Sequence, residues 1–332
     1  MMTTIKDVAK MAGVASSTVS CVLNDKGNVS EPTRLRVLEA ASQLNYVRHG
    51  PASELKRNST QTIGIIVHDM SSPYFSDLVN GIETVVMSHG YDMIVCSSLG
   101  GEKSTAHRYI RERRIDGAIV IAQNIQDQLL IEASEAGFPI VVMDRDLDAQ
   151  HIVKVLMSDT QGGYLATRYL IDKGHRTIAY ISGPSQSECN LHRYQGYLKA
   201  LKEAGIEENP EWKIGGQFMK QDGYDAAKKL LEGELPSAVF FANDEMAIGG
   251  LEAFREHDIS IPEQLSVIGF DNIPASQYMN PPLTTFRQPK RDAGQLAGHV
   301  LFQLLNGEIV ETLYTLDIQC VERDSVRLLN LS

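Results

Sequence analysis

The first 46 residues carry three short stretches of helical periodicity joined by turns. Apolar residues recur three and four positions apart in 5–12, 16–23 and 31–45. Gly13 stands where the first helix would end, and Ser30 and Pro32 fit the N-cap and first turn of the third. The expected inward-facing residues are Ile5, Val8, Ala9 and Ala12, then Val19, Val22 and Leu23, and finally Leu35, Leu38, Ala41 and Leu44. Two helices joined by a short turn with a glycine predict a helix-turn-helix.

From residue 62 onward, short β-branched runs alternate with amphipathic segments of helix length. The expected strands are 62–67, 93–97, 117–122, 139–143, 177–182, 238–242 and 265–270. The expected helices include 74–89, 102–114, 160–173, 190–205, 222–232 and 244–257. Strand–helix alternation with nearly continuous apolar strands predicts parallel sheets covered on both faces. The predicted fold class is therefore α/β, with a three-helix head followed by two lobes that each contain a parallel sheet.

Composition places the chain among ordinary globular proteins. Its 332 residues are 43% hydrophobic and 22% charged, which suits a sizeable core and two or three domains. No apolar run reaches the roughly 18 residues of a membrane span, and the N-terminus lacks an apolar signal core. The four cysteines are scattered without C-x-x-C spacing, which argues against zinc or a disulfide framework. We therefore expect a cytoplasmic protein without a membrane partner.

The charge is distributed unevenly along the chain. The whole protein carries −11, but residues 1–60 hold eight Lys/Arg and five Asp/Glu, which leaves −14 for the remainder. A basic head on an acidic body is typical of a small DNA-binding module joined to a larger domain. A chance excess of surface lysines is the simpler alternative.

The second predicted helix presents small polar groups opposite its apolar side. Ser16, Ser17, Ser20 and Cys21 fall largely on this outer side. Such a face packs poorly in a core but suits a major groove, where hydroxyls meet base edges and phosphates. These residues therefore favour a nucleic-acid interface over a plain helical head.

The motifs in their order resemble one known family. The stretches "TIKDVAKMAGVASSTVSCVLN", "VSEPTRLRVLEAASQLNY", "TIGIIV", "RRIDGAIV", "DKGHRTIAYISGP", "FFANDEMAIGGLEAF", "LSVIGFDN" and "LTTFRQP" together resemble the lactose-repressor/galactose-repressor (LacI/GalR) family of bacterial transcription regulators. The resemblance covers nearly the whole chain. It implies a DNA-binding domain at 1–46, a hinge at 47–60 and a bilobed effector domain at 61–332, similar to periplasmic binding proteins. The lobes would be roughly 61–160 with a 290–326 crossover, and 161–290.

The resemblance also assigns DNA contacts to this chain. The implied DNA-binding residues are Thr4, Ser16, Ser17, Thr18, Ser20, Cys21, Asn24 and Leu55. Cys21 departs from the frequent arginine at its position and cannot form a bidentate pair with guanine, so a different operator base is expected there; a half-buried packing role is the alternative. Ala15 replaces a usual serine N-cap, and Ser16 is the alternative cap.

The stretch 46–60, "YVRHGPASELKRNST", reads as a domain boundary because it is polar and contains Gly-Pro. In the family a hinge helix here inserts a leucine into the minor groove, and Leu55 matches that leucine. Glu54 departs from the family pattern because its negative charge would lie near phosphates. A flexible tether is the alternative to a hinge helix.

Candidate effector residues follow the predicted strands, because ligands of parallel α/β sheets bind beyond the carboxyl ends of strands. The polar residues at such ends are Asp69, Asp144, Asn243, Asp244 and Asp271, while Arg193 offers a fork of donors and Phe218 an apolar face. The family resemblance implies effector contacts for Arg193, Asp271, Asn243 and Phe218, and adds the pair Tyr74 and Phe75. A helix cap remains an alternative role for Asp271, and core or interlobe packing an alternative for the aromatic residues.

No motif indicates catalysis. The chain lacks G-x-G-x-x-G after the first strand, the P-loop, G-x-S-x-G and H-E-x-x-H, and the pairs Gly162-Gly163 and Gly249-Gly250 are explained by helix packing. We expect no enzyme activity, no cofactor, no metal and no catalytic residues. The predicted function is a homodimeric repressor that binds a near-palindromic double-stranded DNA operator and responds to a small-molecule effector, a sugar or sugar derivative. The alternatives are control by a phosphorylated coregulator protein, or a solute-binding protein that does not bind DNA.

Overall fold

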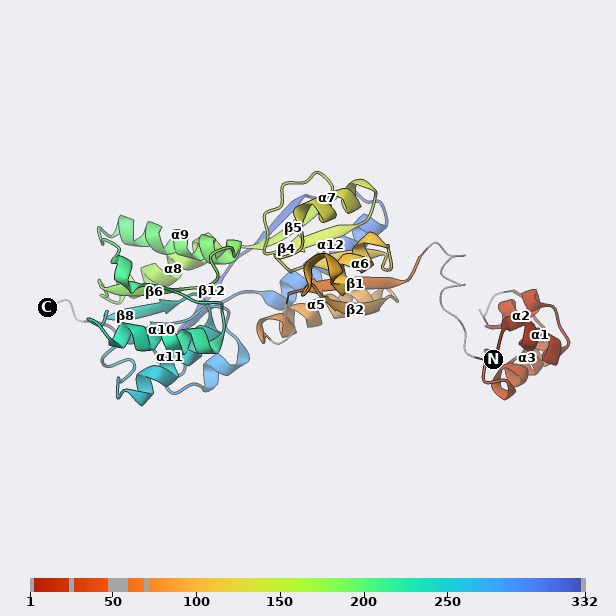
Figure 1. Ribbon diagram of the computed structural model, residues 1–332, viewed down its shortest axis with the longest axis horizontal. Helices are drawn as coiled ribbons and strands as arrows, with labels where there is room; N and C mark the ends of the chain where they lie inside the picture. The colour runs from red at the N-terminus through yellow and green to blue at the C-terminus, as the bar shows by residue number, and fades with distance from the viewer. Residues whose placement is uncertain (1–2, 24–26, 47–58, 69–71, 330–332) are drawn as a thin grey trace. The chain divides into compact units, whose positions relative to one another are not determined.

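The computed structural model describes residues 3–23, 27–46, 59–68 and 72–329 (Figure 1). Its internal contacts divide the chain into two units, Met1–Thr60 and Gln61–Ser332, which we describe separately. Within the described residues, no helix is long and apolar enough to cross a membrane.

The first unit contains helices α1 (Ile5–Ala12), α2 (Ser16–Leu23) and α3 (Glu31–Gln43). The hydroxyl and amide of Thr4 donate to Asp7 Oδ2 at the start of α1, and Gly13 ends this helix with a φ of 65°. A left-handed φ of this kind is accessible to glycine at little cost. The Ala15 carbonyl accepts from the amides of Thr18 and Val19, so Ala15 and not Ser16 stands at the N-cap of α2.

The inward face of α3 differs from the expected stripe. Leu35 and Leu38 are 58% and 45% exposed, whereas Val37 and Ala40 are buried against α1 and α2. The expectation for the two leucines is wrong. Three short helices enclose only a narrow core, and the smaller Val37 and Ala40, on the adjacent side of α3, fill it. The other inward-facing residues expected in α1 and α2 belong to this core or pack against it.

The second unit contains two α/β lobes. The first lobe holds a six-stranded parallel sheet in the order β11-β5-β4-β3-β1-β2. Its elements are β1 (Thr62–Val67), α5 (Tyr74–Ser88), β2 (Asp92–Ser97), η1 (Gly101–Lys103), α6 (Thr105–Arg111), β3 (Gly117–Val120), α7 (Asp127–Glu135), β4 (Ile140–Met143), β5 (Ile152–Met157), α12 (Lys290–Leu305) and β11 (Leu313–Leu316). The central strands β3 and β4 are buried along their whole length, as expected for a parallel sheet covered on both faces.

The second lobe holds a four-stranded parallel sheet in the order β7-β6-β8-β9. Its elements are α8 (Asp159–Asp172), β6 (Ile178–Ser182), α9 (Glu188–Glu203), η2 (Pro210–Trp212), β7 (Lys213–Gly215), α10 (Lys220–Leu231), β8 (Ala238–Phe241), α11 (Asp244–Glu256), β9 (Ser266–Ile268) and η3 (Pro274–Tyr278). The predicted α/β class with two parallel sheets is confirmed.

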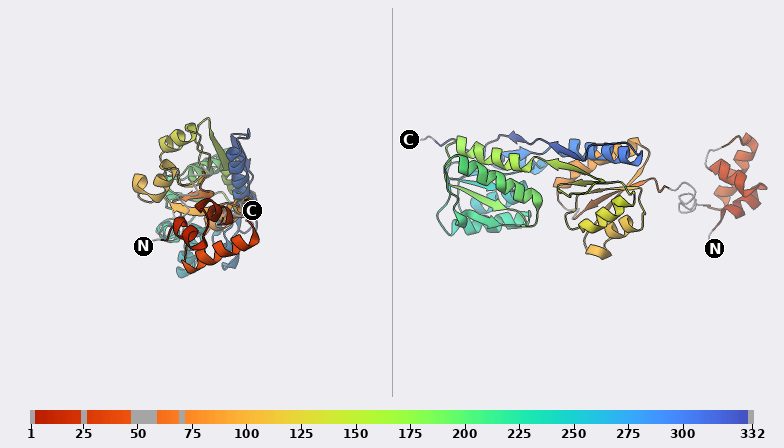
Figure 2. Two further views of the ribbon diagram at one scale, coloured as in Figure 1. Left: turned by 90° about the vertical axis from the view of Figure 1, so that its right-hand side faces the viewer. Right: turned by 90° about the horizontal axis from the view of Figure 1, so that it is seen from above.

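Two antiparallel strands join the lobes, β10 (Thr285–Arg287) and β12 (Gln319–Val321). Figure 2 shows the blue C-terminal segment running from the first lobe back along the second. After β12 the chain is fixed to the second lobe where the Val267 amide donates to the Ser325 carbonyl and the Leu329 amide donates to the Lys173 carbonyl. The chain therefore passes between the lobes three times, after β5, after β10 and before β12.

Glycines allow three helix pairs to pack backbone against backbone. A Cβ on Gly163 of α8 would lie 2.1 Å from the Arg193 carbonyl oxygen of α9, and a Cβ on Gly249 of α11 would lie 1.9 Å from the Lys220 carbonyl oxygen of α10. Gly81 of α5 lies equally close to Arg291 of α12. Helix packing thus explains Gly163 and Gly249, whereas their neighbours Gly162 and Gly250 face the side chains of Phe270 and Phe241.

His175 fixes the C-terminal tail and should make stability depend on pH. The ring is fully buried, with its nitrogens 3.1 Å from Ser237 Oγ and 3.3 Å from the Arg327 carbonyl oxygen, and burial lowers its pKa to about 4. The unfolded chain, with a His pKa near ~6.5, takes up this proton first. The resulting stability is present above that pH and is lost as pH falls toward 4, by roughly 3 kcal/mol.

Urea unfolding of the full chain between pH 7.5 and 4.5 checks this expectation. His175→Gln should show a shallower loss of the free energy of unfolding than wild type, whereas His151→Gln, at an exposed position, should follow wild type. Equal pH dependence in the two variants would contradict a role for His175.

Candidate DNA-binding face and effector site

The predicted DNA-binding face lies on α2. Ser16 and Ser17 are exposed, while Thr18, Ser20 and Cys21 are half-buried on the same helix. Val19 and Val22 point inward and hold the helix against its neighbours. The hydroxyl-rich side is therefore available to a partner, and Cys21 lies at its edge.

The other predicted DNA contacts are less fully described. Thr4 is exposed, but its side chain donates to Asp7 Oδ2 at 2.7 Å. Asn24 and Leu55 lie outside the described residues, as does Asp69 of the effector set.

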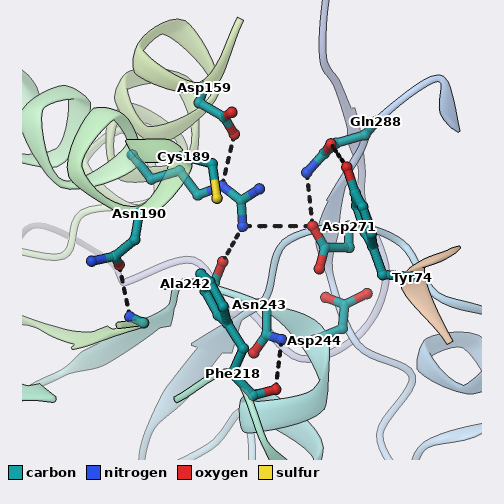
Figure 3. Close-up of polar contacts among 12 residues, drawn as sticks. Tyr74, Asp159, Cys189, Asn190, Phe218, Ala242, Asn243, Asp244, Asp271 and Gln288 are labelled. Carbon is teal, nitrogen blue, oxygen red and sulfur yellow. Dashed lines mark hydrogen bonds and ion pairs between the residues drawn. The ribbon is translucent and has the colours of Figure 1, made fainter. Parts of the chain in front are cut away.

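Arg193 is the centre of the candidate effector site, and Figure 3 shows three of its partners, Asp159, Ala242 and Asp271. The Arg193 side chain of α9 is 4% exposed; Nε donates to Asp159 Oδ1 at 2.8 Å and Nη1 donates to the Ala242 carbonyl at 2.7 Å. The same Nη1 lies 3.6 Å from Asp271 Oδ1. Burial alone would lower the pKa of Arg193, but the carboxylates of Asp159 and Asp271 hold it well above its usual value. Among the described residues Nη2 has no partner, so one donor of the guanidinium remains for a ligand.

Asp271 is linked to the first lobe through Gln288. Gln288 Nε2 donates to Asp271 Oδ1 at 2.8 Å, and Gln288 Oε1 lies 2.9 Å from the Tyr74 hydroxyl. Lys290, itself 4% exposed, donates to the Asp271 carbonyl at 3.0 Å and lies 5.5 Å from the centre of the Tyr74 ring. Burial raises the pKa of Asp271 to about 7, although Arg193 and Lys290 both favour the carboxylate.

Asp144 presents an unused acceptor from the first lobe. Its Oδ2 lies 3.1 Å from the Tyr74 hydroxyl, whereas Oδ1 is enclosed and has no hydrogen-bond partner among the described residues. Burial and the charge of Asp159 raise its pKa to about 6, while the hydrogen bond from Tyr74 lowers it. An enclosed acceptor without a donor loses the free energy of hydration and gains a partner when a ligand supplies one.

Three aromatic rings border these charges. Tyr74 and Phe75 meet edge to face with centroids 5.4 Å apart at the start of α5. Phe218 is half-buried and packs on Gly183, where any Cβ would lie only 2.2 Å from the ring. The rings thus offer apolar surface beside the polar groups.

Backbone strain also collects at this site. Asp144, Phe218 and Asp271 have positive φ angles of 54°, 66° and 105°. Such angles are uncommon for residues other than glycine and persist where surrounding structure imposes them, often at functional positions.

Asn243 and Asp244 make local structural contacts. Asn243 caps α11 by accepting from the Met246 amide at 3.0 Å and donates to the Phe218 carbonyl at 2.9 Å. Asp244 is fully buried and accepts from the Ile273 amide, Ser276 and Thr285. Asn243 therefore positions Phe218, and Asp244 joins the start of α11 to η3 and to β10.

The sequence did not indicate three members of the site, namely Asp159, Gln288 and Lys290. Asp159 follows β5, which the pattern analysis did not recognise as a strand; an apolar run at 152–157 followed by Ser-Asp was the available signal. Gln288 lies just before α12 and Lys290 begins this helix, and both reach the site through the crossover. Their side chains are 2% and 4% exposed, which no local pattern indicates for Gln or Lys.

Further contacts hold the lobes together beside the site. Ser72 donates to Glu245 Oε1 at 2.8 Å, and the Asp146 amide donates to Glu188 Oε2 at 2.6 Å. Within the described part of the chain, no group of His, Cys, Asp and Glu is placed to hold a metal ion. The arrangement is suited to binding a molecule with both donors and acceptors.

Comparisons with known proteins agree with this architecture. The model of the lacI family of bacterial regulatory proteins matches residues 4–49, and that of the periplasmic binding protein-like domain matches residues 167–326. An HTH-type transcriptional repressor PurR from Pasteurella multocida (strain Pm70) is 41% identical over 309 residues, covering 92% of each chain. A repressor of the same name from Vibrio cholerae serotype O1 (strain M66-2) is 38% identical over 333 residues, covering 98% of each.

Solved structures show similar folds. The lac repressor dimer bound to operator and the anti-inducer ONPF is 28% identical with a TM-score of 0.84, over 98% of this chain and all (100%) of that one. A LacI family regulator from Enterococcus faecium with bound ribose is 31% identical with a TM-score of 0.74, over 81% of this chain and 100% of that one. The complex of the regulator CelR with cellobiose is 28% identical with a TM-score of 0.73, over 97% and 99%.

The fold, the helix-turn-helix and the effector site together define a class, that of transcriptional repressors which bind DNA and respond to a small molecule. The chain belongs to the LacI family of bacterial regulatory proteins. The predicted family and the repressor function are confirmed by these relatives, and so is the expectation that the chain is a regulator rather than an enzyme.

Proposed function

We propose that the effector of this repressor is an uncharged polyhydroxylated molecule, a sugar or sugar derivative, bound between the lobes at Arg193, Asp271, Asp144 and the three aromatic rings. The observation that carries this proposal is that the same site holds an enclosed acceptor without a donor, Asp144 Oδ1, and a donor nitrogen without a partner among the described residues, Arg193 Nη2. A sugar hydroxyl both donates and accepts, so adjacent hydroxyls satisfy an acceptor and a donor together.

The aromatic rings and the charges support the same class of ligand. Phe218, Tyr74 and Phe75 offer apolar faces for a sugar ring. Three carboxylates, Asp144, Asp159 and Asp271, face the cations Arg193 and Lys290 in the described part of the site. An excess of carboxylates repels a phosphorylated ligand. Two similar regulators were solved with cellobiose and with ribose.

We further propose that the protein acts in the cytoplasm as a homodimer on a near-palindromic operator. One solved relative is a repressor dimer on its operator, and the symmetry of a dimer requires two matching half-sites. Ser16, Ser17 and Cys21 would select bases, Thr4, Thr18, Ser20 and Asn24 would support the contact, and Leu55 would enter the minor groove. Effector and operator must then alter each other's affinity by the same factor.

Ligand-induced thermal shifts test the effector class. The full chain is screened at pH 8 with neutral mono- and disaccharides, their phosphate esters, and nucleobases. A neutral sugar should raise the melting temperature, and the same sugar should bind about tenfold or more weakly at pH 5.5, because Asp271 and Asp144, with pKa values of about 7 and about 6, lose their charge. Asp144→Asn is expected to remove part of this pH dependence.

The outcomes separate the candidate signals. Stabilisation by nucleobases or by phosphate esters alone would contradict the sugar assignment. Selection of the genomic fragments that bind the protein in about 0.15 M salt tests the predicted operator independently, because sequence-independent binding to phosphates is weak at this salt concentration. Recovery of a single palindrome, with protein binding that the sugar weakens or strengthens, would support the whole proposal. Recovery of a palindrome whose binding does not respond to the sugar would indicate a coregulator protein.

A further inference from the structure

A compact basic cluster lies on the first lobe, at the end of η1, in α6 and in the turn after it. Five of the twelve residues from 103 to 114 are Lys or Arg and one is acidic, although residues 61–332 carry −14 in total. The five cationic side chains are all exposed: Lys103, Arg108, Arg111, Arg113 and Arg114. The cationic residues of the candidate effector site, Arg193 and Lys290, are by contrast buried.

Most of this charge is not neutralised within the protein. Arg114 pairs with Glu112 at 2.6 Å, and Arg113 donates to the Ala136 carbonyl. Within the described parts of the chain, the side chains of Lys103, Arg108 and Arg111 have no hydrogen bond or ion pair. Arg108 and Arg111 lie three residues apart on α6 and therefore project from the same side of the helix.

The cluster reaches the edge of the first lobe at which the chain enters. Asp116, just beyond the arginines, accepts from the Gln61 amide at 2.9 Å, and Gly117 of β3 is in register with Ile63 of β1. The amino ends of these parallel strands share one edge of the sheet, and the end of α6 lies beside it (Figure 1). The segment that leads to the DNA-binding head is attached at this edge.

We propose that this cluster is a second DNA-contact surface, which binds backbone phosphates beside the operator without reading bases. Exposed, unpaired arginines match the charge and the bidentate geometry of phosphates. The attachment of the DNA-binding head at the same edge favours DNA over an acidic protein as the partner. Contacts made by this surface would increase the affinity for DNA of any sequence, while α2 would recognise the operator bases.

The salt dependence of binding measures such contacts directly. Full-length protein is titrated with a duplex of about 40 base pairs of arbitrary sequence in roughly 0.05 to 0.2 M NaCl. The variant Arg108→Gln/Arg111→Gln should reduce the slope of log K against log salt by about 1 to 4, depending on how many of these side chains in the dimer reach phosphates. The control Lys202→Gln/Lys229→Gln removes equal charge from exposed positions of the second lobe and should leave the slope close to wild type.

Two further measurements guard against a trivial result. The melting temperature of the arginine variant should equal that of wild type, and Arg108→Glu/Arg111→Glu should weaken binding further. The preference for the selected operator over arbitrary DNA should be retained, since this surface reads no bases. A slope equal to that of the lysine control would overturn the proposal. Loss of operator preference with an unchanged slope would also contradict it, because it would show that the arginines act on base recognition by the DNA-binding head.

Discussion

Arg193→Ala is expected to abolish the response of DNA binding to the effector and to lower the free energy of unfolding of the effector unit by about 3–5 kcal/mol. The guanidinium neutralises Asp159 and Asp271 in an environment from which water is excluded, since the side chains of Arg193 and Asp159 are 4% exposed and that of Asp271 is 6% exposed. Its removal leaves buried carboxylates without a partner and frees the Ala242 carbonyl. Urea unfolding and effector titration by calorimetry measure the two effects.

The half-exposed Arg168 of α8 provides the matched control. It pairs with Asp172 across one helical turn, and the two side chains are 42% and 59% exposed, so Arg168→Ala should cost less than about 1 kcal/mol and leave the effector response intact. Asp159→Asn in the Arg193→Ala background should recover part of the lost stability. An Arg193→Ala protein as stable as the control would show that this ion-pair cluster contributes little to folding.

Gly163→Ala is expected to lower the free energy of unfolding by about 3 kcal/mol, and to impair effector binding as well. The new Cβ would lie 2.1 Å from the Arg193 carbonyl oxygen, a backbone atom that no rotamer change can move away. Helices α8 and α9 must therefore separate. Asp159 begins α8 and Arg193 lies in α9, so their 2.8 Å hydrogen bond lengthens with the separation.

Gly233→Ala is the control for this substitution, because a Cβ there meets no atom within 4 Å and the φ is not left-handed. Thermal unfolding and effector titration of the two variants should differ clearly. If Gly163→Ala and Gly233→Ala unfold at the same temperature, the close contact of α8 and α9 is not rigid.

Local sequence patterns predicted the features that depend only on residues close together in the sequence. The hydroxyl side of α2 and the polar residues after β4, β8 and β9 could be placed because helical spacing and strand ends are properties of neighbouring residues. The stripe on α3 could not, since Leu35 and Val37 are both apolar and only the surrounding helices decide which one is enclosed. Asp159 was missed together with the strand that precedes it, in which Lys154 interrupts the apolar run.

The sequence by itself determined the family, the order of the domains, the α/β class and the residue types available for DNA and ligand. The tertiary structure alone decided that Arg193 lies between Asp159 and Asp271, that Gln288 links Asp271 to Tyr74, and that Asp144 keeps an unpartnered oxygen. These contacts join residues 17 to 214 positions apart. Hydrogen bonds and ion pairs act over a few ångströms, so their partners are set by how the lobes and the crossover pack rather than by local spacing.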